Sequence, residues 1–224
     1  MAMREDLRSP VEHRDGDSGF TLTELLVSMA IFAIVITVFM GAMVSITHAT
    51  ARAQEVANAG DSVRMAFQML DRQIRYAEAI NSPGVGSSGA HYFEFLTSAQ
   101  RDGELPLCTQ WRFDPVEGTL AYRTWRDVTV GTVSDWREVA DWMRNDLSGA
   151  TPRTPFTLLS TGGSRTRQEL VVSFDAGRTP TSEAGADVAT SFVARNSSAG
   201  SITNDNNKDG VSDAFVCTSH LGRP

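Results

Sequence analysis

The first eighty residues divide into a polar segment and a long apolar one. Residues 1–18 carry three arginines and five acidic side chains and have no helical or strand period. After Gly19, Glu24 is the only ionisable side chain of the stretch FTLTELLVSMAIFAIVITVFMGAMVSIT. The 23 uncharged residues after Glu24 would rise about 34 Å as a helix, enough to cross a hydrocarbon core of about 30 Å. The polar segment is therefore a predicted leader, and the apolar one is a predicted membrane span.

The helical pattern continues beyond the apolar stretch. Apolar residues recur at steps of seven, four, three, four and three, and they form one stripe: Val56, Val63, Phe67, Leu70, Ile74 and Ala77. Pro83 cannot extend a helix, and a glycine-rich run follows it. The pattern predicts one helix that ends near residue 80, with its first half in the membrane and its second half packed on a globular head.

From residue 91 onward the chain changes to short alternating or apolar runs, which are typical of strands. These runs predict strands over residues 91–97, 108–113, 119–125, 169–175 and 189–195, with a weaker one over 214–218. The second and third of them predict a β-hairpin. Residues 134–147 predict a short helix instead, because Asp135 and Glu138 form a capping box and the apolar residues that follow share one face.

These elements predict an α+β fold, with one long N-terminal helix packed on an antiparallel β-sheet. The expected organisation has three parts: a leader over residues 1–19, a helix over residues 20–80 whose transmembrane half is about 20–47, and a β-rich head over residues 81–224. The 224 residues, 41% of them hydrophobic, suffice for one core beside a membrane helix. The net charge is −7 and no segment is basic overall, so we expect no nucleic-acid partner.

Glu24 is unusual because it lies inside an apolar segment, where an unpaired carboxylate is costly. A secretory signal peptide is cut after its apolar run, next to small residues, whereas here Gly19 precedes the run. A cut after Gly19 would create an α-amino group at Phe20, which could neutralise Glu24. A plain signal anchor that is never cut at this point is the alternative.

Residues 19–27, with the sequence GFTLTELLV, resemble the class III signal of type IV prepilins and type II secretion pseudopilins. The resemblance implies that a prepilin peptidase cuts between Gly19 and Phe20 and methylates the new N-terminal residue. It also implies that Glu24 pairs with the amino group of a neighbouring subunit and sets the axial register of a filament. The long leader of mixed charge departs from the family, and so does Gly41, which stands where major pilins often carry a proline.

The resemblance implies the lollipop fold of pilins, a single pass through the cytoplasmic membrane with the head outside, and then an extracellular or periplasmic filament. The predicted hairpin and residues 192–196 resemble, more weakly, the minor pilin group called PilW and the J-type pseudopilin. The implied function is a minor pilin or pseudopilin, not an enzyme, that helps initiate or cap a type IV pilus-like filament. Its expected partners are the prepilin peptidase, other pilins or pseudopilins, and the membrane.

Residues 205–213 have the D-x-N-x-D-G-x-x-D spacing of a calcium loop. The expected ligands are four side chains and one backbone carbonyl: Asp205, Asn207, Asp209, Asp213 and the carbonyl of Val211. The bidentate glutamate that closes an EF-hand is missing, so we expect weakly bound calcium with a structural role. An Asx-rich turn without an ion accounts for the same residues. With calcium, a tip-located adhesin or ligand-binding module becomes the alternative function.

Cys108 and Cys217 are the two cysteines, and their spacing does not fit a metal site. If the head lies outside the cytoplasm, a disulfide between them would stabilise it by about 4 to 5 kcal/mol in the chain-entropy model. Two separate buried thiols are the alternative. The four histidines stand in contexts that form no catalytic set, so we expect no catalytic residues.

Overall fold

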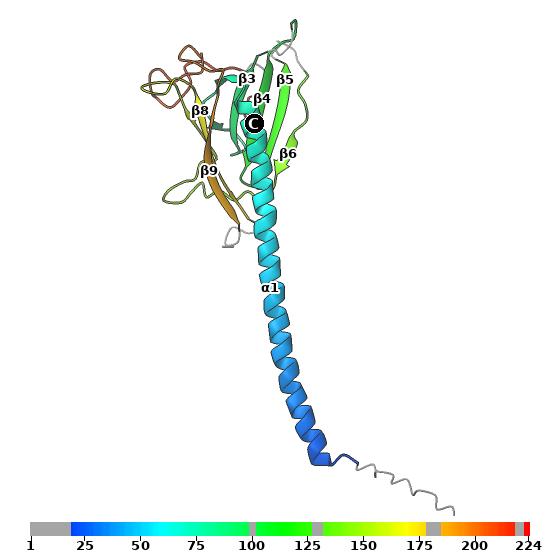
Figure 1. Ribbon diagram of the computed structural model, residues 1–224. Coiled ribbons are helices and arrows are strands. Elements are labelled where there is room, and N and C mark those ends of the chain that lie inside the picture. The colour runs from blue at the N-terminus through cyan, green and yellow to red at the C-terminus, as the bar shows by residue number, and fades with distance from the viewer. Residues whose placement is uncertain (1–18, 99–101, 127–131, 178–184, 218–221) are drawn as a thin grey trace, which may run out of the picture. The chain divides into compact units, whose positions relative to one another are not determined.

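The computed structural model describes residues 19–98, 102–126, 132–177, 185–217 and 222–224. Its contacts divide the chain into two compact units, Met1–Ala49 and Thr50–Pro224, and the second unit is called the head below. Helix α1 (Leu22–Ile74) belongs to the first unit up to Ala49 and to the head from Thr50 onward. Figure 1 shows α1 as one continuous helix that leads into a β-rich head.

Helix α1 begins after Thr21, whose side-chain oxygen accepts a hydrogen bond from the backbone N–H of Glu24 at 3.3 Å. This is the bond of an N-cap residue, and it satisfies one of the free N–H groups of the first turn. Within the head, the helix buries one stripe: Ala59, Val63, Ala66, Leu70 and Ile74. The predicted apolar stripe is confirmed over its second half, whereas Val56 is exposed.

The helix is shorter than predicted, because it ends at Ile74 rather than near residue 80. Ala77–Ile80 form strand β1 instead, paired antiparallel with β3 (His91–Thr97). The backbone N–H of Tyr76 donates to the carbonyl of Gln73, which closes the turn between the two elements. Pairing with a strand that lies later in the chain therefore overrides the helical periodicity at Ala77.

The larger sheet, sheet A, has six strands in the order β1-β3-β4-β5-β6, and β2 pairs with β3 beside β1. All of these pairs are antiparallel. The remaining strands of sheet A are β2 (Gly84–Val85), β4 (Leu107–Asp114), β5 (Thr119–Arg126) and β6 (Arg137–Ala140). The predicted strand at 91–97 and the predicted hairpin are confirmed, and the α+β class is confirmed with them.

The smaller sheet, sheet B, has the antiparallel order β7-β8-β9, and β8 and β9 lie side by side in Figure 1. Its strands are β7 (Phe156–Leu159), β8 (Glu169–Ala176) and β9 (Ala186–Val193). The predicted strand over 169–175 is confirmed as β8. The predicted strand over 189–195 starts earlier and ends at Val193, because Arg195 turns back and its backbone N–H donates to the carbonyl of Arg75.

Aromatic side chains join the helix and the two sheets into one core. Phe67 of α1 stacks on Phe174 of β8 at 5.5 Å between ring centroids. Phe93 of β3 lies 4.7 Å from Phe156 of β7, which brings sheet A against sheet B. The core of the head is therefore built between the inner faces of both sheets and the second half of α1.

The predicted helix over residues 134–147 is wrong. Arg137–Ala140 form β6, which pairs with β5, and Trp142 has a left-handed φ of 57°. The backbone N–H of Met143 donates to the carbonyl of Gly118 in the hairpin turn. Contacts with the hairpin therefore replace the hydrogen bonds that a helix would make here. The weaker strand predicted over 214–218 is also wrong over Ala214–Cys217, and its last residue lies outside the described residues.

Candidate assembly site and calcium loop

The first unit exposes its apolar side chains. Every residue from Phe20 to Ile46 is exposed in the single chain, and Phe20 itself is 82% exposed. Among the described residues, α1 is the one helix that is long and apolar enough to cross a membrane by length and composition. Such a surface requires either lipid or the apolar surfaces of other chains around it. Membrane anchoring through the N-terminal part of α1 is consistent with this surface.

The predicted cleavage point lies immediately before α1. Gly19 and Phe20 are exposed and non-helical, and the helix starts two residues after Phe20. A peptidase needs its substrate backbone in an accessible, extended form, because a helical peptide bond is tied into the hydrogen-bond ladder. The structure therefore leaves the Gly19–Phe20 bond accessible, and whether it is cut stays a prediction.

Glu24 lies in the first turn of α1, where the positive end of the helix dipole favours a carboxylate. Thr21 and Glu24 have the spacing of a capping box, a signal that explains the N-terminal end of the helix. The side chain of Glu24 is exposed, and no hydrogen bond or ion pair of its carboxylate to another described residue is present. The carboxylate is therefore available to a charged partner from outside the chain.

The structure joins Cys108 and Cys217 in a disulfide, with the two Cα atoms 5.5 Å apart. Cys108 lies on β4, and Cys217 comes after all the strands, so the bond ties the C-terminal segment to sheet A. The two cysteines are 109 residues apart in the sequence, and the bond therefore closes a long loop.

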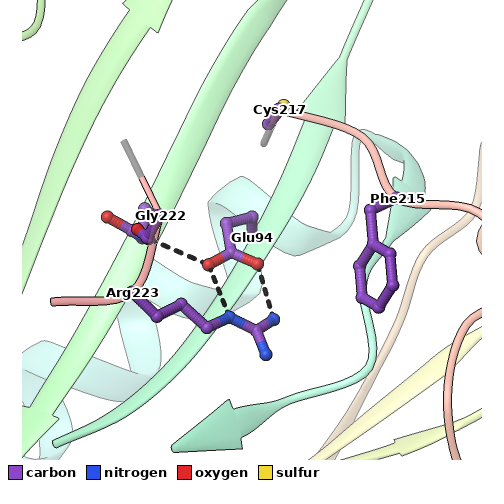
Figure 2. Close-up of a pocket in the computed structure, with 6 residues that line it drawn as sticks. Glu94, Phe215, Cys217, Gly222 and Arg223 are labelled. Atoms are coloured by element: carbon purple, nitrogen blue, oxygen red, sulfur yellow. Dashed lines mark hydrogen bonds and ion pairs between the residues drawn. The ribbon is translucent and has the colours of Figure 1, made fainter. Parts of the chain in front are cut away.

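A second tie to the C-terminal segment was missed from the sequence. Glu94 of β3 is only 2% exposed, and its two carboxylate oxygens accept bonds from Nε and Nη2 of Arg223 at 3.0 and 2.7 Å. Figure 2 shows this pair beside Cys217, Gly222 and Phe215. Asn81 and Gln110 donate to the same carboxylate at 3.0 and 2.9 Å. The sequence did contain a signal for this pair, because Glu94 lies between two aromatic residues in a predicted strand. A carboxylate buried at such a position needs a hydrogen-bonding or charged partner.

A cavity of about 280 Å³ lies at this pair, and it is lined by Glu94, Gln110, Phe215, Cys217, Gly222 and Arg223. The carboxylate in its wall is fully occupied by the bonds above. The backbone oxygen of Pro224 also accepts a bond from the hydroxyl of Tyr92 at 2.8 Å. This region therefore holds the chain's own C-terminal residues in place.

Trp136 belongs to the stretch for which the sequence predicted a helix, and its ring lies against side chains of sheet A instead. Its half-buried ring contacts two guanidinium groups, those of Arg112 at 4.8 Å and Arg123 at 4.4 Å from the ring centroid. Burial lowers the pKa of Arg123, and the nearby charge of Arg112 lowers it further. The indole attracts both cations through its π face and lets two like charges lie close together on sheet A.

The predicted calcium loop is compact, and its side chains bond to its own backbone. The carboxylate of Asp205 accepts the N–H groups of Asp209 and Gly210 at 3.0 and 2.8 Å. Gly210 has a φ of 85°, which explains the need for glycine there. Asn207 accepts the N–H of Asp209 at 3.1 Å, and Asp213 accepts the side chain of Asn206 at 2.7 Å.

These bonds are those of Asx turns, and they account for the loop without an ion. Within the described ranges, no group of three or more His, Cys, Asp or Glu side chains converges as a metal site. The side chains of the three aspartates are therefore not assembled around one point. Calcium binding by this loop stays a prediction.

Comparison with known families gives a match in the N-terminal segment. Residues 14–40 match the family model of the prokaryotic N-terminal methylation motif. The matched stretch contains Gly19, Phe20, Glu24 and the apolar part of α1 up to Met40. Neither the curated proteins nor the solved structures yield a match to this chain.

The match supports a type IV pilin-like protein, which is the class that the N-terminal resemblance implied. Such a signal implies processing by a peptidase and assembly with other pilins. The match ends at residue 40 and thus gives no information on the head.

Proposed function

We propose that this chain is a minor pilin or pseudopilin, a non-enzymatic subunit that helps initiate or cap a type IV pilus-like filament. A prepilin peptidase cuts it between Gly19 and Phe20 and methylates Phe20. The head then stands outside the cytoplasmic membrane while the N-terminal part of α1 remains in it, and the subunit later leaves the membrane for an extracellular or periplasmic filament.

The observation that carries this proposal is the lone carboxylate of Glu24 at the start of the exposed apolar part of α1. Glu24 is the only ionisable residue between Phe20 and His48, and its carboxylate has no hydrogen bond or ion pair to another described residue. A carboxylate near a bilayer requires a cation or a hydrogen-bond donor. The free amino group of a neighbouring subunit's first residue supplies that cation, and the pair fixes the axial position of one helix against the next.

Glu24→Ala tests this role. We expect the variant to be cut normally, since the scissile bond is unchanged, but to be absent from filaments sheared from the cells. Immunoblots of the membrane and sheared fractions measure both outcomes. Filament content equal to that of the unchanged chain would refute the assigned role.

Two control variants separate assembly from helix capping. Thr21→Ala removes the capping oxygen that bonds to the N–H of Glu24 but keeps the carboxylate, so we expect incorporation to persist. Asp61→Asn removes an exposed acid of α1 within the head, and we expect no loss of incorporation. If all three variants fail alike, helix stability rather than pairing of Glu24 explains the result.

A second candidate is a calcium-dependent adhesin or ligand-binding module at the filament tip. It is supported by the spacing of residues 205–213 and by the left-handed Gly210, both of which fit a calcium loop. It requires Asp205, Asp209 and Asp213 to turn from their present bonds toward one ion. Loss of ligand binding by the full chain on chelation would favour this function over a purely structural one.

A further inference from the structure

The edges of the two sheets differ in how their backbone groups are protected. An edge strand exposes a row of unpaired N–H and C=O groups that can pair with another chain, so proteins shorten, bulge, charge or cover such edges. The head has two sheets and therefore four edges. Three of these edges carry such protection, and the fourth does not.

Both edges of sheet A are protected. At one edge, β1 is four residues long and has a register shift, and its outer backbone groups are bonded to side chains. The N–H of Ile80 donates to Gln168 at 2.9 Å, and the carbonyl of Glu78 accepts from Ser201 at 2.8 Å. At the other edge, β6 is also four residues long, has a register shift against β5, and exposes Arg137 and Glu138.

One edge of sheet B is protected by a short strand. Strand β7 has four residues, and Pro155 precedes it directly. It contacts β3 of sheet A, with the ring of Phe156 packed 4.7 Å from that of Phe93. Strand β7 is thus short and preceded by a proline, two features that protect an edge.

Strand β9 at the other edge of sheet B has none of these protections. It is eight residues long and pairs with β8 over all eight without a register shift. Its sequence ADVATSFV contains no proline and no lysine, and its one charge, Asp187, is held by Arg153 at 2.5 Å. In the described part of the chain, its backbone makes no hydrogen bond on the side away from β8.

The inner face of sheet B is also incompletely covered at β9. Val188, Thr190 and Phe192 pair with the buried residues of β8 and so face the core. Phe192 is 8% exposed, yet Val188, on the same face, remains 38% exposed. One more strand beside β9 would bury the side of Val188 and continue the apolar inner face.

We infer that the free edge of β9 is a docking site for an extended segment of a different subunit of the filament, which adds to sheet B as a fourth strand. This inference rests on the proposed filament function. The segment is uncharged, because Asp187 is already neutralised by Arg153. It carries apolar or β-branched side chains at alternate positions, which continue the face of Val188 and Phe192.

A second copy of this chain fits the edge less well. Self-pairing of β9 that continues the inner face is antiparallel about a two-fold axis, which turns the second head upside down. Subunits that enter one membrane through the same N-terminal segment share one orientation. The donated segment therefore comes from another protein with its own extended strand.

Hydrogen exchange measures this pairing directly, because amides that gain a strand partner exchange more slowly. The full chain is compared in detergent and in filaments sheared from cells. We expect the peptide that covers residues 186–193 to exchange on the order of tenfold more slowly in filaments. We expect the exchange of β6, the charged short edge, to stay the same.

Each result of this experiment supports or contradicts the inference. Filaments that contain the chain without added protection of β9 contradict the docking site but leave the filament function intact. Absence of the chain from filaments contradicts the filament function and the inference together. If the protection of β9 in detergent increases with the concentration of the chain, a second copy of the chain occupies the edge. That result contradicts the inference that a different subunit docks there.

A pair of proline variants provides an independent test. The N–H groups of successive residues in a strand point in opposite directions. Of the two variants Ala189→Pro and Thr190→Pro, one therefore removes an N–H that bonds to β8. The other removes an N–H that points away from β8, at the free edge. We expect one variant to lose thermal stability. We expect the other to melt close to the unchanged chain but to enter filaments at least about tenfold less. Normal incorporation of the thermally stable variant contradicts the inference.

Discussion

The two units of this chain differ in whether their apolar side chains are buried or exposed. In the head, Phe93, Trp111 and Phe174 are fully buried by the chain's own sheets and helix. In the first unit, every apolar residue from Phe20 to Ile46 is exposed in the single chain. The head can therefore reach its folded state through its own contacts, whereas the apolar part of α1 requires lipid or other subunits. Changes in the first unit should affect processing and assembly, and changes in the head should affect stability.

The largest expected effect in the first unit is the loss of processing in Gly19→Arg. A long cationic side chain in place of the glycine hydrogen should prevent a peptidase from binding the residue before the scissile bond. We expect the precursor to accumulate uncut in the membrane, as measured by the mass of the purified chain. Thr23→Ala is the control and should be cut normally. Complete cleavage of Gly19→Arg would show that processing does not depend on Gly19.

The largest expected effect in the head is on its stability. Cys108→Ser combined with Cys217→Ser opens a loop of 109 residues, which should lower the free energy of unfolding by about 4 to 5 kcal/mol in the chain-entropy model. Denaturant unfolding of the oxidised chain and of the variant measures the difference. Cleavage after Gly19 should be unchanged. A variant as stable as the oxidised chain would show that the disulfide contributes little.

A smaller loss of stability is expected from Arg223→Gln. The change leaves the buried carboxylate of Glu94 without its cation, which should cost about 3 kcal/mol. Glu94→Gln together with Arg223→Gln removes both charges and should be less destabilised than Arg223→Gln alone. Unfolding curves of the two variants provide the comparison. Equal stability of Arg223→Gln and the unchanged chain would indicate that Asn81 and Gln110 suffice for the carboxylate.

Calcium should have a still smaller effect. At a free concentration a few times its dissociation constant, a weakly bound ion would add about 1 kcal/mol to the stability of the head. Melting of the unchanged chain and of Asp209→Asn, with calcium and with a chelator, measures this contribution. We expect calcium to raise the melting temperature of the unchanged chain only. Identical melting of both chains under both conditions would favour the ion-free Asx turns.

The smallest expected effect concerns pH. Burial lowers the pKa of His91 below its ordinary value of 6.5 in the folded head. The unfolded state therefore binds the proton more tightly, and the head should lose some stability as the pH falls below about 6.5. His91→Gln should reduce this loss between pH 7 and pH 5, as measured by melting. An unchanged pH dependence in the variant would assign the effect to other groups.

Periodicity predicted the elements whose partners lie nearby in the sequence. The stripe from Val63 to Ile74 and the hairpin of β4 and β5 both follow from local spacing. Residues 134–147 have a spacing that fits a helix as well, and contact with β5 and the hairpin turn decides against it. Ala77 continues the helical stripe but pairs with β3. Competition between local spacing and distant pairing cannot be decided from the spacing itself.

The candidate sites divide in the same way. Gly19, Phe20 and Glu24 could be predicted because the signal is a short run of neighbouring residues, and the family match covers that run. The pair of Glu94 and Arg223 joins residues 129 positions apart, so only the fold brings them together. The free edge of β9 likewise depends on which strands lie at the edges of each sheet. The sequence of a single strand does not determine the order of the strands in a sheet.

The most direct test of the account is the N-terminal residue of the protein extracted from membranes. Edman sequencing or intact-mass analysis should show a chain that starts at Phe20 with an N-methyl group. The amine available to Glu24 exists only in such a chain. A chain that still starts at Met1, or one that was cut on the far side of the apolar run after Thr47, would contradict the filament function.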